Sequence, residues 1–567
     1  MRCKIRVILA LIFVQVLIIL LFWSLFKNPE LFEPKISIFS SQNEKFETNR
    51  SEELLFKKIL CNINGEYNIS CRKELDEVYI PFTFIKKYFE IYGKTFEKNN
   101  VEFFNWSHSY ANVYVPKKQY DPRGAFTHFQ SYKVEERERV KCISAAEGVP
   151  LSTQWDSNGY YYPTQIAQFG LSHYSKNLME PNPVKYIHEN GENVQAYWIT
   201  PYKSVVKRIY DNDAASTVFC FNNTEKKFIV LKSNFSLPIL SFNLKLKPNN
   251  ISRFVVTVEN IVEKKIYYIH YICNSQHILI ADYDIYYGLF CEGKSKWYKL
   301  SRDILIDLQK GIMLKTKSKT KLQRSSFKIL NISLKGEGCI DNLTSLSSDH
   351  MTQFQLTVDW FLKHQDESTG GWPNPVTRKM AGSLILKSGW YSAMGQGHAL
   401  SVLARAYFVF NKEIKYLETA RKALNPFQRL SKDSGVLAMY MQGLPWYEEY
   451  PTNPPTFVLN GFIYSLIGLY DLHKLAPVGY SHEPYMLYVQ GMKSLKKLLT
   501  SFDTGSGTTY DLRHVTLGTA PRLARWDYHA THVNQLYLLS SIDNDPLFSI
   551  TAKRWLGYMY GKRASHN

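Results

Sequence analysis

The pattern of apolar and polar positions begins with a long apolar run near the N-terminus. Residues 7–26 form a 20-residue run that is apolar except for Gln15 and Ser24, and three cations precede it. This length matches the roughly 20 residues that a helix needs to cross a bilayer. Because a positive flank remains cytoplasmic, the run predicts a single-pass type II anchor after a cytoplasmic tail of residues 1–6. A cleaved signal peptide is the alternative, but the run ends without a small-residue cleavage site.

Beyond this anchor the pattern divides the chain into four segments. Residues 27–75 are polar and are expected to form a stem, and residues 76–215 mix short strand-like runs with turns and many tyrosines. Residues 216–345 alternate between apolar and polar positions, as in Phe242-Asn-Leu-Lys-Leu246. This period of two predicts an antiparallel β-sandwich or barrel.

The period becomes helical near Asp349. Phe354, Val358, Phe361 and Leu362 form one apolar stripe, and further stripes follow to the end of the chain. Residues 346–567 are therefore expected to form five or more helices joined by Gly- and Pro-rich loops. The arrangement resembles the incomplete α/α barrels of polysaccharide-acting enzymes, so the predicted fold class is α+β and multidomain.

Two further features place most of the chain in the secretory pathway. Asn-X-Ser/Thr sequons, expected to be glycosylated, occur at Asn49, Asn68, Asn105, Asn222, Asn234, Asn250, Asn331 and Asn342. Of eight cysteines, Cys3 precedes the anchor, so seven are luminal and at least one is unpaired. Cys61–Cys71 and Cys273–Cys291 are candidate local disulfides, although sequence alone does not determine pairing.

Composition narrows the class of partner. The chain has 69 Lys and Arg against 50 Asp and Glu, a net charge of +19, and 15% of its residues are aromatic. The aromatic content excludes a disordered or low-complexity protein. The charge indicates an acidic partner, and in the lumen this is expected to be a glycosaminoglycan and not a nucleic acid.

Three clusters in the helical segment combine acidic, basic and aromatic residues. They are Trp446-Tyr-Glu-Glu-Tyr-Pro451, Tyr510-Asp-Leu-Arg-His514 and Arg525-Trp-Asp-Tyr-His529. Such loops and helix starts commonly carry function; the alternative is that their tryptophans plug the end of a barrel while the charges face water. Dinucleotide-binding, phosphate-binding-loop, zinc and nucleophile-elbow motifs are absent. Carboxylate and tyrosine acid–base chemistry remains.

Several runs closely resemble the heparan sulfate D-glucuronyl C5-epimerase family. They are residues 139–144, 147–155, 162–177, 389–394, 446–451, 457–462 and 525–529. The similarity extends from about residue 80 to Asn567 and is weakest between residues 200 and 340. It implies a homodimeric type II enzyme of the Golgi membrane with an N-terminal β-hairpin region, a β-barrel and a C-terminal α/α barrel. The implied substrate is N-sulfated heparosan.

The implied reaction inverts C5 of D-glucuronic acid within the polymer and gives L-iduronic acid. A base and an acid act on opposite ring faces, and an arginine offsets the negative charge of the carbanion. The resemblance places Glu449, Tyr510, Tyr528 and Tyr120 at catalytic positions, with Arg513 as the arginine. Which tyrosine serves which face is left open.

Further residues are expected to hold the polymer. The resemblance implies this role for Tyr132, Lys133, Arg137, Gln154, Tyr162, Gln165, Tyr450, Asn460, Tyr464, Asp511, Arg522, Arg525, His529 and Asn534. The arginines among them suit bidentate binding of carboxylate and sulfamate groups.

The resemblance also implies a calcium ion in the β-domain. Calcium requires several oxygen ligands, prominently carboxylates, and the matching residues 222–243 contain one acid, Glu225. The calcium site of the family is therefore poorly matched, which leaves its presence open, and the chemistry itself requires no cofactor.

Three other functions share parts of this pattern. A polysaccharide lyase begins with the same proton removal, and a glycoside hydrolase would pair Glu448 or Glu449 with Asp511 or Asp527. A catalytically inactive luminal glycosaminoglycan-binding protein would need only the basic and aromatic residues.

Overall fold

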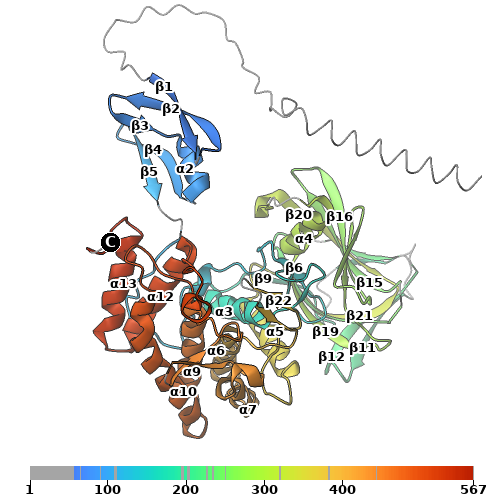
Figure 1. Ribbon diagram of the computed structural model, residues 1–567. Coiled ribbons are helices and arrows are strands. Elements are labelled where there is room, and N and C mark those ends of the chain that lie inside the picture. The colour runs from blue at the N-terminus through green and yellow to red at the C-terminus, as the bar shows by residue number, and fades with distance from the viewer. Residues whose placement is uncertain are drawn as a thin grey trace, which may run out of the picture. The chain divides into compact units, whose positions relative to one another are not determined.

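The computed structural model describes most of the chain after residue 56 (Figure 1). The described ranges are 57–63, 65–89, 91–107, 111–192, 197–200, 205–224, 228–232, 235–249, 251–317, 321–380, 384–441 and 443–565. The predicted tail and anchor lie outside them, as do Asn49, Asn234, Asn250 and Glu225. Within the described ranges, every helix is too short or too polar to cross a membrane.

The described residues form two compact units that divide between Phe84 and Ile85. The first contains an antiparallel sheet of β1 (Lys57–Ile63), β2 (Tyr67–Glu74) and β3 (Glu77–Tyr79). The predicted Cys61–Cys71 disulfide is confirmed and joins β1 to β2. The described end of the segment expected to form a stem, from Lys57 onward, therefore forms strands, and a cross-link can hold a sheet that is too small to bury a core.

Helix α2 (Phe82–Phe89) spans the division, and the second unit then begins with a hairpin of β4 (Tyr92–Lys98) and β5 (Val101–Ser107). A small sheet of β6 (Val140–Ile143), β7 (Pro150–Ser152) and β8 (Tyr160–Tyr161) follows. These elements agree with the mixed β character expected for this part of the sequence.

The alternating segment forms two sheets. The seven-stranded sheet has the order β10 (Trp198–Ile199), β13 (Ile229–Leu231), β20 (Phe327–Lys335), β15 (Arg253–Asn260), β16 (Lys265–Ile272), β18 (Asp284–Gly288) and β17 (Ile278–Ala281). The six-stranded sheet has the order β11 (Val206–Asp211), β12 (Ser216–Asn222), β21 (Glu337–Leu346), β14 (Ile239–Leu246) and β19 (Trp297–Asp303), with β9 (Lys185–Glu189) also paired to β21. Leu240, Phe242, Leu244 and Leu246 are buried on one face of β14, as the period of two requires.

Each of these sheets carries one disulfide. Cys220 of β12 is bonded to Cys339, its direct partner on β21, and the predicted Cys273–Cys291 disulfide is confirmed. Cys142 is a buried free thiol. Among the described cysteines this leaves one thiol unpaired, in agreement with the odd luminal count.

Helices dominate after residue 349, so the predicted change of period and the α+β class are confirmed. They are α5 (His350–Lys363), α6 (Ala393–Val409), α7 (Ile414–Lys422), α8 (Asn425–Gln428), α9 (Leu459–Leu475), α10 (Val478–Leu498), α11 (Arg513–Leu517), α12 (Trp526–Ile542) and α13 (Pro546–Tyr558). Short hairpins interrupt them: β22 (Arg378–Lys379) with β23 (Ile385–Leu386), and β24 (Leu437–Tyr440) with β25 (Leu444–Tyr447). Helix α9 packs against α6, α10 and α12, which places it at the centre of this region.

One helix of this core was not predicted. Helix α3 (Pro163–Met179) packs on α5 and α6, far from both in sequence. Its residues are buried on all sides from Pro163 to Lys176, although many are polar. A helix buried in this way shows no apolar stripe, which explains why its sequence does not read as a helix.

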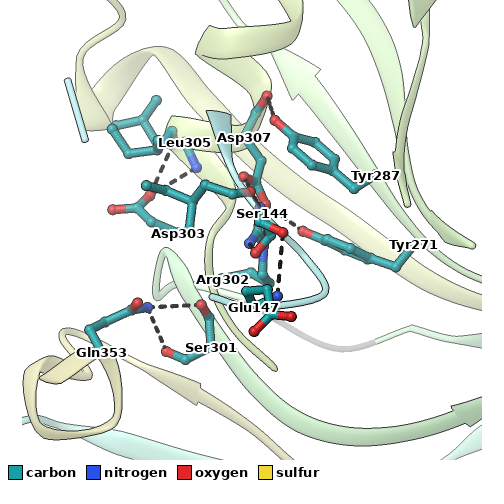
Figure 2. Close-up of polar contacts among 12 residues, drawn as sticks. Ser144, Glu147, Tyr271, Tyr287, Ser301, Arg302, Asp303, Leu305, Asp307 and Gln353 are labelled. Carbon is teal, nitrogen blue, oxygen red and sulfur yellow. Dashed lines mark hydrogen bonds and ion pairs between the residues drawn. The ribbon is translucent and has the colours of Figure 1, made fainter. Parts of the chain in front are cut away.

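A polar cluster joins the sandwich to its neighbours (Figure 2). Arg302 at the end of β19 donates to the Asp307 carboxylate of α4 (Ile304–Thr316) and to the carbonyl oxygens of Ile143 and Ser144. From α5, Gln353 Nε2 donates to the carbonyl and hydroxyl oxygens of Ser301 at 2.8 and 3.0 Å. The sandwich, the β6 segment and the helices are therefore fastened together at one place.

Candidate active site

The central carboxylate of the candidate site is Glu449, which follows β25. Glu449 is 4% exposed. Asn460 Nδ2, in the first turn of α9, lies 3.4 Å from Glu449 Oε2. The next residue, Gly461, has no side chain, and a Cβ there would lie 2.6 Å from Glu449 Cβ. The glycine lets α9 approach the carboxylate closely.

Tyrosines and tryptophans surround this carboxylate. Tyr450, Tyr510 and Trp390 belong to one buried apolar cluster, and Tyr528 and Trp155 pack against it. The rings of Tyr510 and Tyr528 are in edge contact, with centroids 4.9 Å apart and an interplanar angle of 77°. The structure therefore brings together side chains that are far apart in the sequence, between Trp155 and Tyr528.

Burial raises the pKa of Glu449, while hydrogen bonding from Tyr450 and the charges of Arg378 and Arg522 lower it. Burial, and then the Glu449 charge, raises the pKa values of Tyr450, Tyr510 and Tyr528. These tyrosines are therefore protonated at neutral pH. A carboxylate whose basicity is increased and phenols that keep their protons suit the two halves of a proton transfer.

Two arginines of the site share one acid. Arg513 Nε donates to both Asp511 carboxylate oxygens at 2.9 and 2.8 Å, and both side chains are buried. Arg522 lies 3.5 Å from the same carboxylate, and its guanidinium lies over the Tyr510 ring at 4.4 Å. Asp511, which was predicted to bind the polymer, thus positions Arg513 and offsets part of the charge of the two arginines.

Arg378 of β22 is a further cation in this group. Its guanidinium carbon lies 3.5 Å from the ring centroid of Tyr450 and 4.5 Å from that of Trp155. Arg378 also lines a pocket of about 590 Å³ together with Lys379, Arg513 and Arg522. The pocket places positive charge beside the buried carboxylate.

The adjacent Glu448 faces the protein interior. It is fully buried, its Oε1 accepts from the Phe457 backbone N–H at 2.9 Å, and its own N–H donates to the Val436 carbonyl oxygen. Burial raises the pKa of Glu448 to about 8. Glu448 thus holds the loop before α9, which leaves Glu449 as the acid of this pair that faces the aromatic cluster.

The structure does not bring Tyr120 together with these residues. The Tyr120 hydroxyl donates to Asp471 at 2.9 Å and accepts from Arg405 at 2.9 Å. Asp471 lies 11 residues after Asn460 on α9, which corresponds to about 16 Å along a helix. Tyr120 therefore hydrogen-bonds to a buried ion pair that lies away from Glu449. The resemblance in sequence could not show this, because it does not report the path of the loop that carries Tyr120.

The predicted polymer-binding residues separate into groups. Near the site are Asn460 and Tyr162, whose pKa is raised by burial and then by the Glu449 charge, while Gln165 is buried in the first turn of α3. Tyr132 stacks on Phe129 at 4.2 Å, and Arg137 lies 4.9 Å from the Tyr132 ring. Tyr464 packs on Phe126, Phe129 and His398.

Other predicted residues have protein partners. His529 is buried and bonded to Thr508 and to the Trp555 carbonyl oxygen, and Asn534 bonds to the backbone of Asn112 and Tyr114. Both hold neighbouring segments in place. Lys133 and Arg525 are exposed and pair with Glu136 and Asp527, and Gln154 is half-buried.

Arg378, Trp390 and Gly461 were not predicted as site residues. Trp390 and Gly461 lie inside runs that carried the family resemblance, so a closer examination of those runs would have found them. Arg378 lies between such runs, in a short hairpin that has no recurrent pattern of its own. Only its placement in space reveals it.

The described residues do not fit a calcium site of the implied kind. Nowhere in the described ranges do three or more His, Cys, Asp or Glu side chains converge in a way that could hold a metal ion. The described part of residues 222–243 contains no carboxylate. No step below depends on a metal.

Comparison with known proteins decides the family. A D-glucuronyl C5-epimerase from Caenorhabditis elegans is 37% identical over 557 residues, covering 89% of this chain and 89% of that protein. The chain belongs to the D-glucuronyl C5-epimerase family. Two family descriptions match separate parts of it: the D-glucuronyl C5-epimerase β-sandwich domain at residues 215–337, and the C-terminus at residues 365–557.

More distant similarities cover less of the chain. An uncharacterized protein of Methanocaldococcus jannaschii is 30% identical over 175 residues, which is 30% of this chain and 53% of that protein. A solved family 29 carbohydrate-binding module covers 30% of this chain and 91% of its own, with 11% identity and a TM-score of 0.16. That similarity is too low to support an argument about fold or function.

Proposed function

We propose that this protein is an isomerase that converts D-glucuronic acid to L-iduronic acid at C5 within N-sulfated heparosan, as heparan sulfate and heparin are made. The observation that carries the proposal is the position of Glu449 among Tyr450, Tyr510 and Tyr528 in a member of this family. The net charge of +19 supports an anionic polymer as substrate.

The reaction starts when the Glu449 carboxylate removes the C5 proton. The electron pair of the C–H bond remains on the sugar and spreads into its carboxylate, so the intermediate carries two negative charges. Burial supports this step because it raises the basicity of Glu449. Cations beside the pocket stabilise the added charge, which is often a large part of catalysis.

A tyrosine then donates its proton to C5 on the opposite face. Tyr510 and Tyr528 are both suited, since both are protonated before the step. Donation leaves a tyrosinate, and Arg522 over Tyr510 and Arg525 5.7 Å from the Tyr528 ring favour that charge. Solvent restores the proton on tyrosine and removes the one on Glu449, so turnover incorporates solvent hydrogen at C5.

The decisive experiment incubates the protein with N-sulfated heparosan in D₂O and follows C5 by NMR. The proposal expects deuterium at C5, iduronate in the product, an unchanged chain length and no new double bonds. Unsaturated ends would identify a lyase, and shortened chains without unsaturation a hydrolase. Binding without exchange would identify a glycosaminoglycan-binding protein.

We also propose that the protein is a glycosylated, homodimeric type II protein of the Golgi membrane. The apolar run at residues 7–26 and the three disulfides support a secretory address. The sequon residues Asn68, Asn105, Asn222 and Asn342 are exposed, whereas Asn331 is half-buried in β20. Glycosidase sensitivity, organelle imaging and sedimentation of the luminal part test these three properties separately.

A further inference from the structure

The positive charge that the reaction needs has more than one source in the structure, and the sources are not equivalent. Arg513 is buried and committed to both oxygens of Asp511. Arg522 shares that acid at 3.5 Å. Asp511 already offsets the charge of Arg513, so a substrate anion would share Arg513 with a buried carboxylate, although Arg513 Nη2 forms no hydrogen bond among the described residues.

Arg378 has no such competitor. Among the described residues its guanidinium forms no ion pair with an Asp or Glu, and its Nη1 is buried without a hydrogen-bond partner. The group lies close to the rings of Tyr450 and Trp155, at 3.5 and 4.5 Å. The Tyr450 side chain also hydrogen-bonds to the Arg378 guanidinium, so the remaining N–H groups, those of Nη1 among them, are available for a planar anion.

The surroundings of Arg378 connect both parts of the site. On one side Arg378 faces Glu449 and Tyr510. Burial raises the pKa of both groups, and the Arg378 charge opposes that rise. On the other side it lines the 590 Å³ pocket with Lys379, Arg513 and Arg522. Four cations line this pocket and Asp511 offsets one of them, so an anion is strongly favoured there.

We propose that Arg378 binds the carboxylate of the uronate that reacts, with its N–H groups donating to the two carboxylate oxygens. This inference rests on the proposed function, because it names the residue that holds the reacting sugar. The carboxylate gains charge when C5 loses its proton, so the same contact strengthens in the transition state. Arg378 therefore contributes to both binding and kcat.

A cycle that changes both protein and ligand tests the contact. Calorimetry measures the affinity of the wild type and of Arg378→Gln for two ligands. One ligand is an N-sulfated heparosan octasaccharide, and the other is its carboxyl-reduced counterpart, in which glucuronate is replaced by glucose. A charge-assisted bidentate contact is worth about tenfold to a hundredfold in affinity. The wild type should favour the native octasaccharide by that factor, and Arg378→Gln should lose most of the preference.

Two variants control the cycle. Lys379→Gln removes a charge from the same pocket and should weaken the binding of both ligands while preserving their ratio. Arg378→Lys keeps the charge but not the planar fork, so its ratio should fall between those of wild type and Arg378→Gln. Circular dichroism shows whether Arg378→Gln folds. If it does not, the ligand preference of Arg378→Lys tests the contact instead.

Each outcome separates this inference from the proposed function. If Arg378→Gln keeps the wild-type ratio, or if wild type binds both ligands equally, the assignment of Arg378 is wrong even where C5 exchange occurs. If the ratio depends on Arg378 but wild type exchanges no hydrogen at C5, the carboxylate site stands and the epimerase proposal fails. An unchanged kcat in Arg378→Gln would overturn the transition-state part of the inference.

Discussion

Gly461 lies against Glu449, so that a Cβ at position 461 would be 2.6 Å from Glu449 Cβ. Heavy atoms cannot approach so closely, and the replacement Gly461→Ala must move the carboxylate or the start of α9. A displacement of about 1 Å in a catalytic group costs about a hundredfold in rate. We expect Gly461→Ala to lower C5 exchange by about that factor while the protein remains folded.

Gly479 provides the matched control for this prediction. It also lies in a helix, in the first turn of α10, but a Cβ there meets nothing within 4 Å. Gly479→Ala should leave exchange unchanged, and it should preserve or slightly raise the melting temperature because alanine favours the helix. Equal activity of the two variants would show that Glu449 does not need its observed position.

The Glu449 carboxylate itself is the subject of the second prediction. Glu449→Gln keeps the size and the hydrogen-bonding capacity of the side chain but cannot accept the C5 proton. Exchange should fall by about 10²–10⁴-fold, while the affinity for an N-sulfated heparosan octasaccharide changes little. Full exchange activity in this variant would exclude Glu449 as the base.

Particular residues show how far sequence reasoning reached. The alternation at Phe242 to Leu246 and the stripe at Phe354 to Leu362 come from local periodicity, and both elements formed as expected. Glu449 and Tyr528 were predicted because they lie in runs that carry the family resemblance, and Tyr510 lies in one of the clusters that combine acidic, basic and aromatic residues. Arg378 was not predicted, since the residues whose rings it contacts, Tyr450 and Trp155, are distant from it in sequence. Local pattern does not encode such contacts.

Tyr120 is a predicted catalytic residue that the structure places away from Glu449. A tyrosine near a recognised region is easily assigned to catalysis, but its partner Asp471 lies three turns of α9 beyond Asn460. The apolar stripe in this segment predicts the helix, but the sequence does not indicate that Tyr120 contacts its far end. Burial of the Arg405–Asp471 pair also follows only from packing.

The buried acid Glu448 predicts a pH-dependent stability. Its pKa is about 8 in the folded protein against 4.5 ordinarily, so between these values the native state binds more protons than the unfolded state. Through Glu448, stability therefore falls as pH rises from about 4.5 to about 8. Glu448→Gln stays neutral and keeps an acceptor for the Phe457 N–H, so this fall should disappear.

Melting temperatures measured from pH 5 to pH 9 check this prediction. The curve of Glu448→Gln relative to wild type should rise with pH and level off above about pH 8. Glu337→Gln removes an exposed carboxylate that pairs with Lys247, and its curve should remain parallel to wild type. A parallel curve for Glu448→Gln would mean that Glu448 is ionised throughout this range in the folded protein.

The Arg302–Asp307 pair predicts where stability is concentrated. Both side chains are 2% exposed, and Arg302 also donates to two backbone carbonyl oxygens (Figure 2). Arg302→Ala leaves the Asp307 charge buried without its cation, which costs about 3–5 kcal/mol. Lys247→Ala breaks an exposed pair instead and should cost at most about 1 kcal/mol. Chemical denaturation of the two variants measures the difference in free energy of unfolding. Similar losses in the two variants would contradict a special role for the Arg302–Asp307 pair.

Tyr120→Phe separates a structural from a catalytic role for the tyrosine that sequence placed among the catalytic residues. The variant removes one hydroxyl from the buried Tyr120–Asp471–Arg405 group, while the Arg405–Asp471 ion pair at 2.6 Å remains. Loss of a buried hydrogen bond to a charged group costs about 1–3 kcal/mol, so the melting temperature should fall. Exchange per folded molecule, measured well below that temperature, should stay near wild type, whereas Tyr510→Phe should reduce it strongly without a comparable loss of stability. If instead Tyr120→Phe abolishes exchange at an unchanged melting temperature, Tyr120 reaches the substrate and must move away from Asp471 to do so.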